Sequence, residues 1–181
     1  MTVPFLATNL ANEAISRFGH PITIGIIHRT GNAGNDTAKG EANYSHSHAI
    51  QASFYKVIDA TGEVFQVTLP KDTEYAVADP ILNMDSLNYE LTGINGTAIT
   101  APQMKALIAD IKADLATKKI PNHRLSLAEI LAIHNSKPIN GVLGGWCHHK
   151  DITLAVKGPG MSHTDYITEA EMHILLAGIY A

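Results

Sequence analysis

The stretch Gly144-Gly145-Trp146-Cys147-His148-His149-Lys150-Asp151-Ile152, followed by Ser162-His163-Thr164-Asp165, is the part of the chain around which we expect the molecule to be organised. It places three imidazoles, two carboxylates and one thiol in a Gly-rich region that is predicted to be loop-like. Zinc takes ligands of these kinds, and a catalytic zinc uses three protein ligands and keeps one position open. Because this stretch supplies two good ligands in most interpretations, we expect a third from elsewhere.

The candidate third ligand is His28, which ends the apolar run Ile22-Thr23-Ile24-Gly25-Ile26-Ile27. Such a β-rich run predicts a buried strand. A histidine at the end of a central strand is held rigidly by the sheet, as a metal ligand must be. The alternative is a hydrogen-bonded structural histidine, and structural context has to decide between the two.

Two other chemistries stay open on the residues alone. His46 and His48 would point the same way in an extended segment, so they are a rival metal site, with a solvated loop as the alternative. Cys147 is a conceivable hydrolase nucleophile. A lone cysteine beside Trp146 in an apolar stretch is, however, typical of a buried and inert thiol.

The first half of the chain is predicted to be rich in strands. The expected elements are a helix over 9–18, the strand that ends at His28, a hairpin of 52–58 and 63–69, and a strand over 86–92. Segments 30–47 and 75–84 are expected to be irregular, the second because Pro80 interrupts it. Glu90 lies on the polar face of the alternating strand 86–92, where an ordinary exposed carboxylate is the alternative to a catalytic one.

The second half is predicted to be helical, because three capping boxes mark helix starts. They are Thr100-Ala101-Pro102-Gln103, opening a helix to about Lys118, Ser126-Leu127-Ala128-Glu129, opening one through Ile133, and Thr168-Glu169-Ala170-Glu171, opening the last. Strands first and helices after predict an α/β or α+β sheet covered by helices.

Composition predicts one compact domain over 1–181, with its core at about 20–180 and no second domain. The net charge of −4 and the sequence pI of about 6.2 give no basic field that would favour nucleic acid as a partner. No apolar run approaches the roughly 20 residues that cross a bilayer, so membrane insertion is not expected. The start Met1-Thr2-Val3-Pro4-Phe5-Leu6 lacks a basic region and a long apolar core, so no signal peptide is expected.

Five short motifs occur in one order along the chain. They are Ile26-Ile27-His28-Arg29-Thr30, then Ser53 to Asp59 with Gly62 and Gln66, then Ser86 to Gly93, then His149-Lys150-Asp151-Ile152, and finally His163-Thr164-Asp165. In this order the chain resembles the zinc-dependent N-acetylmuramoyl-L-alanine amidases of the type-2 amidase and peptidoglycan-recognition-protein fold, and in particular phage endolysin catalytic domains. The resemblance covers roughly residues 20 to 166.

The resemblance implies an α/β fold with a mixed central β-sheet flanked by helices and one zinc ion held by His28, His149 and Asp165. It implies that Glu90 is a catalytic carboxylate and that His163 stabilises the oxyanion. His148 remains an alternative to His149, and Asp151 is a candidate partner that orients a ligand imidazole. The implied substrate is peptidoglycan, cut between N-acetylmuramic acid and L-alanine.

The chain also departs from the family pattern. Tyr55 stands where a histidine is common, Phe54 where some members carry a catalytic tyrosine, Val77 where a histidine is usual, and Tyr166-Ile167 replaces Pro-Gly. These departures leave open a catalytically inactive muropeptide-binding protein, or a structural component of a virion or secretion apparatus. The expected route is synthesis in the cytoplasm, of the host if the chain is phage-encoded, and action on the cell wall after release, with a separate delivery protein as a possible partner.

Overall fold

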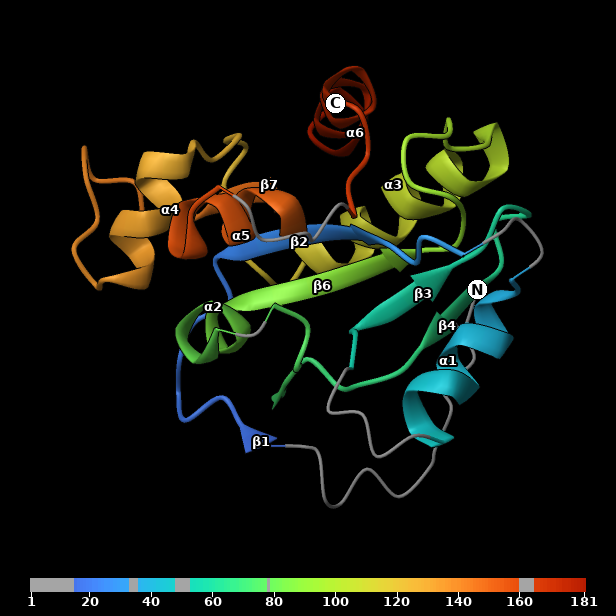
Figure 1. The fold of residues 1–181 in the computed structure, drawn as a ribbon, viewed down its shortest axis with the longest axis horizontal. Coiled ribbons are helices and arrows are strands. Elements are labelled where there is room, and N and C mark those ends of the chain that lie inside the picture. The colour runs from blue at the N-terminus through green and yellow to red at the C-terminus, as the bar shows by residue number, and fades with distance from the viewer. Residues whose placement is uncertain (1–14, 33–35, 48–52, 78, 160–164) are drawn as a thin grey trace.

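The computed structural model describes residues 15–32, 36–47, 53–77, 79–159 and 165–181. Its centre is a five-stranded sheet with the order β4-β3-β6-β2-β7 (Figure 1). Strands β3, β6, β2 and β7 are parallel and β4 is antiparallel to β3, which confirms the predicted mixed sheet. The strands are β2 Ile24–Arg29, β3 Lys56–Ile58, β4 Val64–Gln66, β6 Ser86–Leu91 and β7 Gly145–His148, and a second small sheet pairs β1 Ile15–Ser16 with β5 Asp72–Thr73.

Helices cover both faces of the sheet, as predicted. They are α1 Ala38–Ser47, α2 Pro80–Asp85, α3 Ala101–Leu115, α4 Leu127–His134, α5 His149–Lys157 and α6 Glu169–Ile179. Helices α3 and α6 pack on one face, whereas α1 packs on β3 and β4 and helices α2, α4 and α5 pack beside β2 and β7 on the other face (Figure 1). None of the helices among the described residues is long and apolar enough to cross a bilayer.

The central strands β2 and β6 are buried along their whole length, because both of their faces carry helices. Alternate residues point to opposite faces, so Ile27 belongs to the core under α3 and α6 and Ile26 to the core under α4 and α5. Gly25 is required by this packing, since a Cβ there would lie 2.2 Å from the ring of Trp146.

The predicted helix starts are confirmed in detail at two places. Ser126 and Thr168 each accept a hydrogen bond from the backbone of the glutamate three residues on, whose carboxylate in turn caps them. At α3 only half of the predicted box forms: Thr100 accepts from the Gln103 backbone, but the Gln103 amide donates to the carbonyls of Ile58 and Thr92. That side chain therefore ties α3 to the sheet.

Two predicted irregular segments contain helices. Within 30–47, α1 forms because Ala38 and Ala42, one turn apart, are buried against the sheet, and because Asp59 accepts a hydrogen bond from the Ala38 backbone. Within 75–84, Pro80 begins α2 instead of interrupting the segment. Asp79 caps this helix, and proline is well tolerated in a first turn, which needs no backbone donor there.

Two further predictions of local structure are wrong. Of the expected helix over 9–18, residues 9–14 lie outside the described residues, and the rest is strand β1 followed by Phe18 at φ 51°, a left-handed conformation that no helix continues through. The Gly-rich stretch from Gly144 is not a loop, because its first part is strand β7 and its second is α5. The hairpin is confirmed, with shorter strands than expected.

Candidate active site

The candidate site lies at one edge of the sheet, where three parallel strands end. His28 and Glu90 are register partners near the ends of β2 and β6, and His149 follows the last residue of β7. Ligand sites of open α/β sheets lie beyond the carboxyl ends of the strands. The topology thus brings together residues from distant parts of the chain.

Two imidazoles converge on one carboxylate at this edge. Nδ1 of His149 lies 2.9 Å and Nδ1 of His28 lies 3.2 Å from Oδ2 of Asp165. One ligand atom of each residue lies within 4.8 Å of the others. Burial alone would raise the pKa of the Asp165 carboxyl, but its hydrogen bonds with His149 and His28 outweigh burial and hold this pKa below its usual range.

The pleat of β7 separates the two adjacent histidines. Trp146 packs under α3 and α6 and Cys147 under α4 and α5, so His148 returns to the Trp146 side. There it contacts Arg124 and Asp151. His149, the first residue of α5, turns to His28, and their ring centroids are 4.9 Å apart. Of the two, His149 is the one brought to Asp165.

The other nitrogen of His28 is fixed by Asn88, a residue that sequence reasoning missed. Nε2 of His28 lies 2.8 Å from Oδ1 of Asn88. An amide oxygen accepts only, so with Asn88 in this orientation Nε2 donates a ring proton, and a neutral His28 ring leaves the lone pair of Nδ1 on the side of Asp165. A ring proton on Nδ1, or a metal cation between Nδ1 and Oδ2, would satisfy both atoms. Two imidazole nitrogens and a carboxylate are also the donor set that zinc takes, so the residues present fit that metal.

Glu90 is buried beside this group, not exposed on a strand. Its Oε1 has no hydrogen-bond partner among the described residues. Burial, followed by the charges of Asp165 and Glu41, raises the pKa of the Glu90 carboxyl well above its usual value. Glu41 of α1 was not predicted as a site residue, because its segment was interpreted as a loop. It is buried as well, and Asn32 donates to it at 3.0 Å.

Several predicted residues have other positions or roles. Asp151 does contact an imidazole, but that of His148, whose Nδ1 lies 3.2 Å from Oδ2 of Asp151. Arg124 also binds this carboxylate. Cys147 is fully buried in the core, and burial raises the pKa of its thiol, which disfavours a nucleophile. His163, His48 and the side chain of His46 lie outside the described residues.

Of the residues that depart from the family pattern, some lie at the candidate site and others lie away from it. The Phe54 ring lies 6.2 Å from that of His28, so this residue borders the candidate site. Tyr55 points to the opposite face and donates to Asp114, and Val77 is core. Tyr166 next to Asp165 lies under the Lys150 ammonium, 4.4 Å from its ring centroid.

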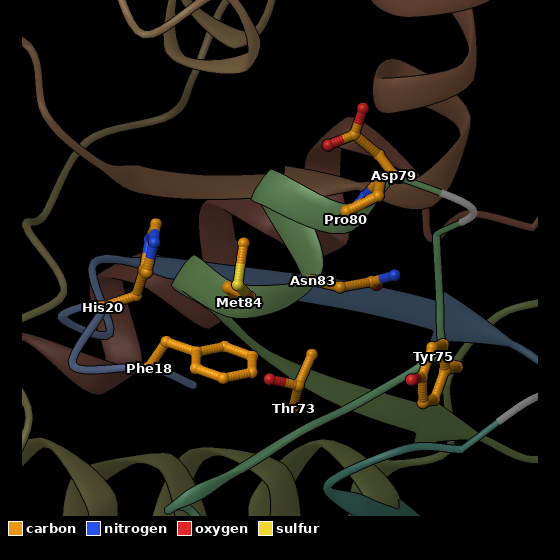
Figure 2. Close-up of a pocket in the computed structure, with 8 residues that line it drawn as sticks. All are labelled: Phe18, His20, Thr73, Tyr75, Asp79, Pro80, Asn83 and Met84. Atoms are coloured by element: carbon orange, nitrogen blue, oxygen red, sulfur yellow. The ribbon is translucent and has the colours of Figure 1, made fainter. Parts of the chain in front are cut away.

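A cavity of about 640 Å³ lies elsewhere, beside α2 and the starts of β2 and β6. Figure 2 shows the Phe18 ring beside Thr73, with Met84 of α2 facing the same space. It is lined by Phe18, His20, Thr73, Tyr75, Asp79, Pro80, Asn83 and Met84. None of the three converging residues lines this cavity, so the cavity is separate from the candidate metal site.

The fold and the converging side chains define an α/β protein with a candidate metal centre at the carboxyl edge of its sheet. A family model described as N-acetylmuramoyl-L-alanine amidase matches residues 18–160. The chain belongs to this family, and the expected amidase class is confirmed. It is accordingly an amide hydrolase that acts on peptidoglycan.

Solved structures share the fold at low sequence identity. The Staphylococcus aureus hydrolase AmiA, in complex with its ligand, aligns with a TM-score of 0.70 and 17% identity over 99% of this chain and 83% of its own. A PlyL mutant gives 0.65 and 12%, covering 100% and 99%, and LysC from Clostridium intestinale gives 0.59 and 16%, covering 97% of each. No curated protein sequence matches the chain.

Proposed function

We propose that this amidase is zinc-dependent, that His28, His149 and Asp165 hold one zinc ion, and that the bond cut is the amide between the lactyl group of N-acetylmuramic acid and L-alanine. The observation that carries this proposal is the convergence of two Nδ1 atoms on one Asp165 oxygen. When bound, zinc supplies a Lewis acid that polarises the carbonyl and activates water.

Glu90 is proposed to move the proton. Hydrolysis adds water across the amide: the carbonyl carbon gains the water oxygen, and the nitrogen of L-alanine leaves with a proton. A general acid–base group must take a proton from the attacking water and return one to the leaving nitrogen. Glu90 suits this role because it is buried at the site and its Oε1 has no partner among the described residues.

The other groups have supporting roles in the proposal. Asn88 keeps the His28 ring in one orientation, and the Phe54 ring beside it limits access of water. His163 is retained as a candidate donor to the oxyanion on the strength of its position two residues before Asp165. Action on the wall after release, by a phage-encoded lytic enzyme with or without a delivery partner, is the biological setting that the family resemblance favours.

Elemental analysis of the purified protein tests the metal site directly. We expect near-stoichiometric zinc in the parent protein and its loss in both His28→Ala and Asp165→Ala. His20→Ala, which removes an exposed histidine paired with Asp85 at 2.8 Å, is the matched control and should keep its zinc.

Release of L-alanine-terminated peptides from purified peptidoglycan tests the reaction. We expect release by the zinc-loaded parent and none after chelation. A zinc-loaded protein that binds muropeptides without releasing peptides would contradict the proposal and support the non-catalytic alternative.

A further inference from the structure

A buried chain of polar side chains runs from His28 to the N-terminal part of the molecule. Behind His28 lies Asn88, whose amide nitrogen donates to Glu74 at 2.7 Å and to Ser86 at 2.9 Å. The Asn88 backbone also donates to Glu74 at 2.7 Å. Arg17 completes the chain, 2.7 Å from the other Glu74 oxygen.

Each member of this chain restricts the next one. Both donors of the Asn88 amide are used on the side of Glu74 and Ser86, so its oxygen must face His28. If the amide were reversed, its oxygen would face the carboxylate oxygen of Glu74, and two acceptors would meet. As long as Glu74 is ionised, the orientation of Asn88 therefore follows from the position of the Glu74 carboxylate.

Arg17 in turn fixes Glu74. The guanidinium also donates to the carbonyls of Pro70 and Met84, at 2.8 Å and 2.7 Å, so it is held from three sides. Glu74 and Asn88 are fully buried, and Arg17 is 4% exposed. Met84 and Phe18, the residue after Arg17, line the cavity of Figure 2, so the chain extends from that region to the candidate metal site.

We propose that Arg17, Glu74 and Asn88 are positioning residues that fix the ring proton of His28 on Nε2 and thereby direct its Nδ1 to the metal. The zinc measurements that test this proposal rest on the proposed function, whereas the measurement of the His28 ring proton does not. Partners behind a metal-bound histidine fix its tautomer and orientation, and their loss typically costs about 10- to 100-fold in metal affinity.

Zinc affinity, measured by competition with a chromogenic chelator, tests the proposal in Asn88→Ala and Glu74→Gln. We expect a loss of about 10- to 100-fold in the first variant. A smaller loss is expected in the second, because a glutamine at position 74 offers an amide group that permits the Asn88 amide to reverse. The matched control is Gln103→Met, which removes an equally buried amide with two hydrogen bonds that is not linked to His28.

The control separates positioning from general destabilisation. The proposal holds if Gln103→Met binds zinc like the parent while the other two variants bind it more weakly. It is overturned if all three lose affinity equally, or if Asn88→Ala and Glu74→Gln bind zinc as tightly as the parent.

Nitrogen-15 NMR of the histidine rings in metal-free protein gives a second readout that needs no zinc. We expect His28 to carry a slowly exchanging proton on Nε2 in the parent, and this signal to be lost in Asn88→Ala. An unprotonated Nε2 in the parent would overturn the proposal. If the parent binds no zinc, the proposed metal function fails, and the NMR signal of the His28 ring proton still decides this inference. If Asn88→Ala does not fold, the NMR spectra of the parent and of Glu74→Gln decide it.

Discussion

The two faces of the sheet both bury charged side chains, but they differ in how many of these groups have hydrogen-bond or ion-pair partners. On the α3 face, the Lys56 ammonium lies 2.7 Å from Asp110 and 2.9 Å from Asp114, and the hydroxyls of Tyr55 and Tyr89 donate to Asp114. On the other face, two imidazoles share one oxygen of Asp165, and Oε1 of Glu90 and Oδ1 of Asp165 have no hydrogen-bond partner among the described residues.

This difference separates a structural cluster from a reactive one. A buried network whose polar groups are paired by hydrogen bonds and ion pairs stabilises one packing, and little is gained by exposing it. A buried set with unused acceptors is costly unless something else satisfies them. The face under α1 and α5 therefore carries the buried acceptors that the proposed metal and water would satisfy.

The largest effect is expected from Glu90→Gln. This substitution removes the proton carrier, so we expect kcat on peptidoglycan to fall about 10²- to 10⁴-fold. Unfolding by urea should show unchanged or higher stability, because a buried carboxyl whose Oε1 has no hydrogen-bond partner among the described residues is replaced by a neutral group. The control is Glu63→Gln in the exposed hairpin turn, and unchanged kcat in Glu90→Gln would remove Glu90 from the proposed reaction.

Lys56→Met is expected to have the opposite effect: it should lower folding stability and leave kcat unchanged. It leaves Asp110 and Asp114 buried without their cation, which typically costs about 3–5 kcal/mol of folding free energy. The kcat of the molecules that remain folded should not change. Lys71→Met, which removes a largely exposed ammonium paired with Asp72, should cost less than about 1 kcal/mol. Equal losses in the two variants would mean that the α3 cluster is not a structural network.

Glu74 gives a pH dependence that sharpens the contrast. Burial raises the pKa of its carboxyl from 4.5 to about 7, although Arg17 and Asn88 lower it. The native state then holds this proton more tightly than the unfolded chain does. Its contribution to stability is complete below about pH 4.5 and is lost as the pH rises through about 7, on the order of 3 kcal/mol in total.

Urea unfolding of chelator-treated protein between pH 4.5 and 8 measures this contribution. Glu74→Gln should be less stable overall, yet it should lack that part of the decline. The other raised carboxyls, such as Glu90 and Asp110, are common to both proteins and cancel in the difference. Parallel stability curves for the parent and the variant would show that Glu74 titrates alike in the folded and unfolded chains.

The smallest effect is expected at Arg124, which lies where the strand edge meets both helical layers. Its guanidinium binds Asp151 at the start of α5 and Glu169 at the start of α6. Because this cluster is partly exposed, Arg124→Met should lower the free energy of unfolding by about 1–2 kcal/mol, and Arg124→Lys by less. Thermal unfolding measures both, and a lysine variant as unstable as the methionine one would argue against a role for the forked geometry.

The sequence predicted those parts of the fold whose signals are local. The boxes at Ser126 and Thr168 lie within one turn of the chain, and the apolar runs of β2 and β6 are long enough to be recognised. Helix α1 was missed because its sequence is weakly apolar and its support comes from Asp59, across the sheet. The stretch at Gly144 was misinterpreted because its glycines serve close approach to Thr23 and His123 and not a turn.

The candidate site was predictable only in part, for the same reason. His28, His149, Asp165 and Glu90 were proposed from spacing and resemblance, and the fold brings all four to one edge. Asn88 and Glu74 have no sequence signal, since a buried asparagine or glutamate looks like a solvent-facing one until the strands are paired. The sequence pattern and the resemblance favoured His149 over His148, and the pleat of β7 gives the physical reason.

The position of β2 between β6 and β7 also affects how the protein becomes active as it is made. Synthesis begins at the N-terminus, so His28 leaves the ribosome long before its partner Asp165, which stands 137 positions later. Strand β2 can pair with both of its neighbours only after β7, Gly145–His148, has been made. Sheets that depend on pairs so far apart in sequence form slowly. A nascent chain therefore lacks one member of the candidate site until Asp165 has emerged, and the site cannot assemble before β7 has paired with β2.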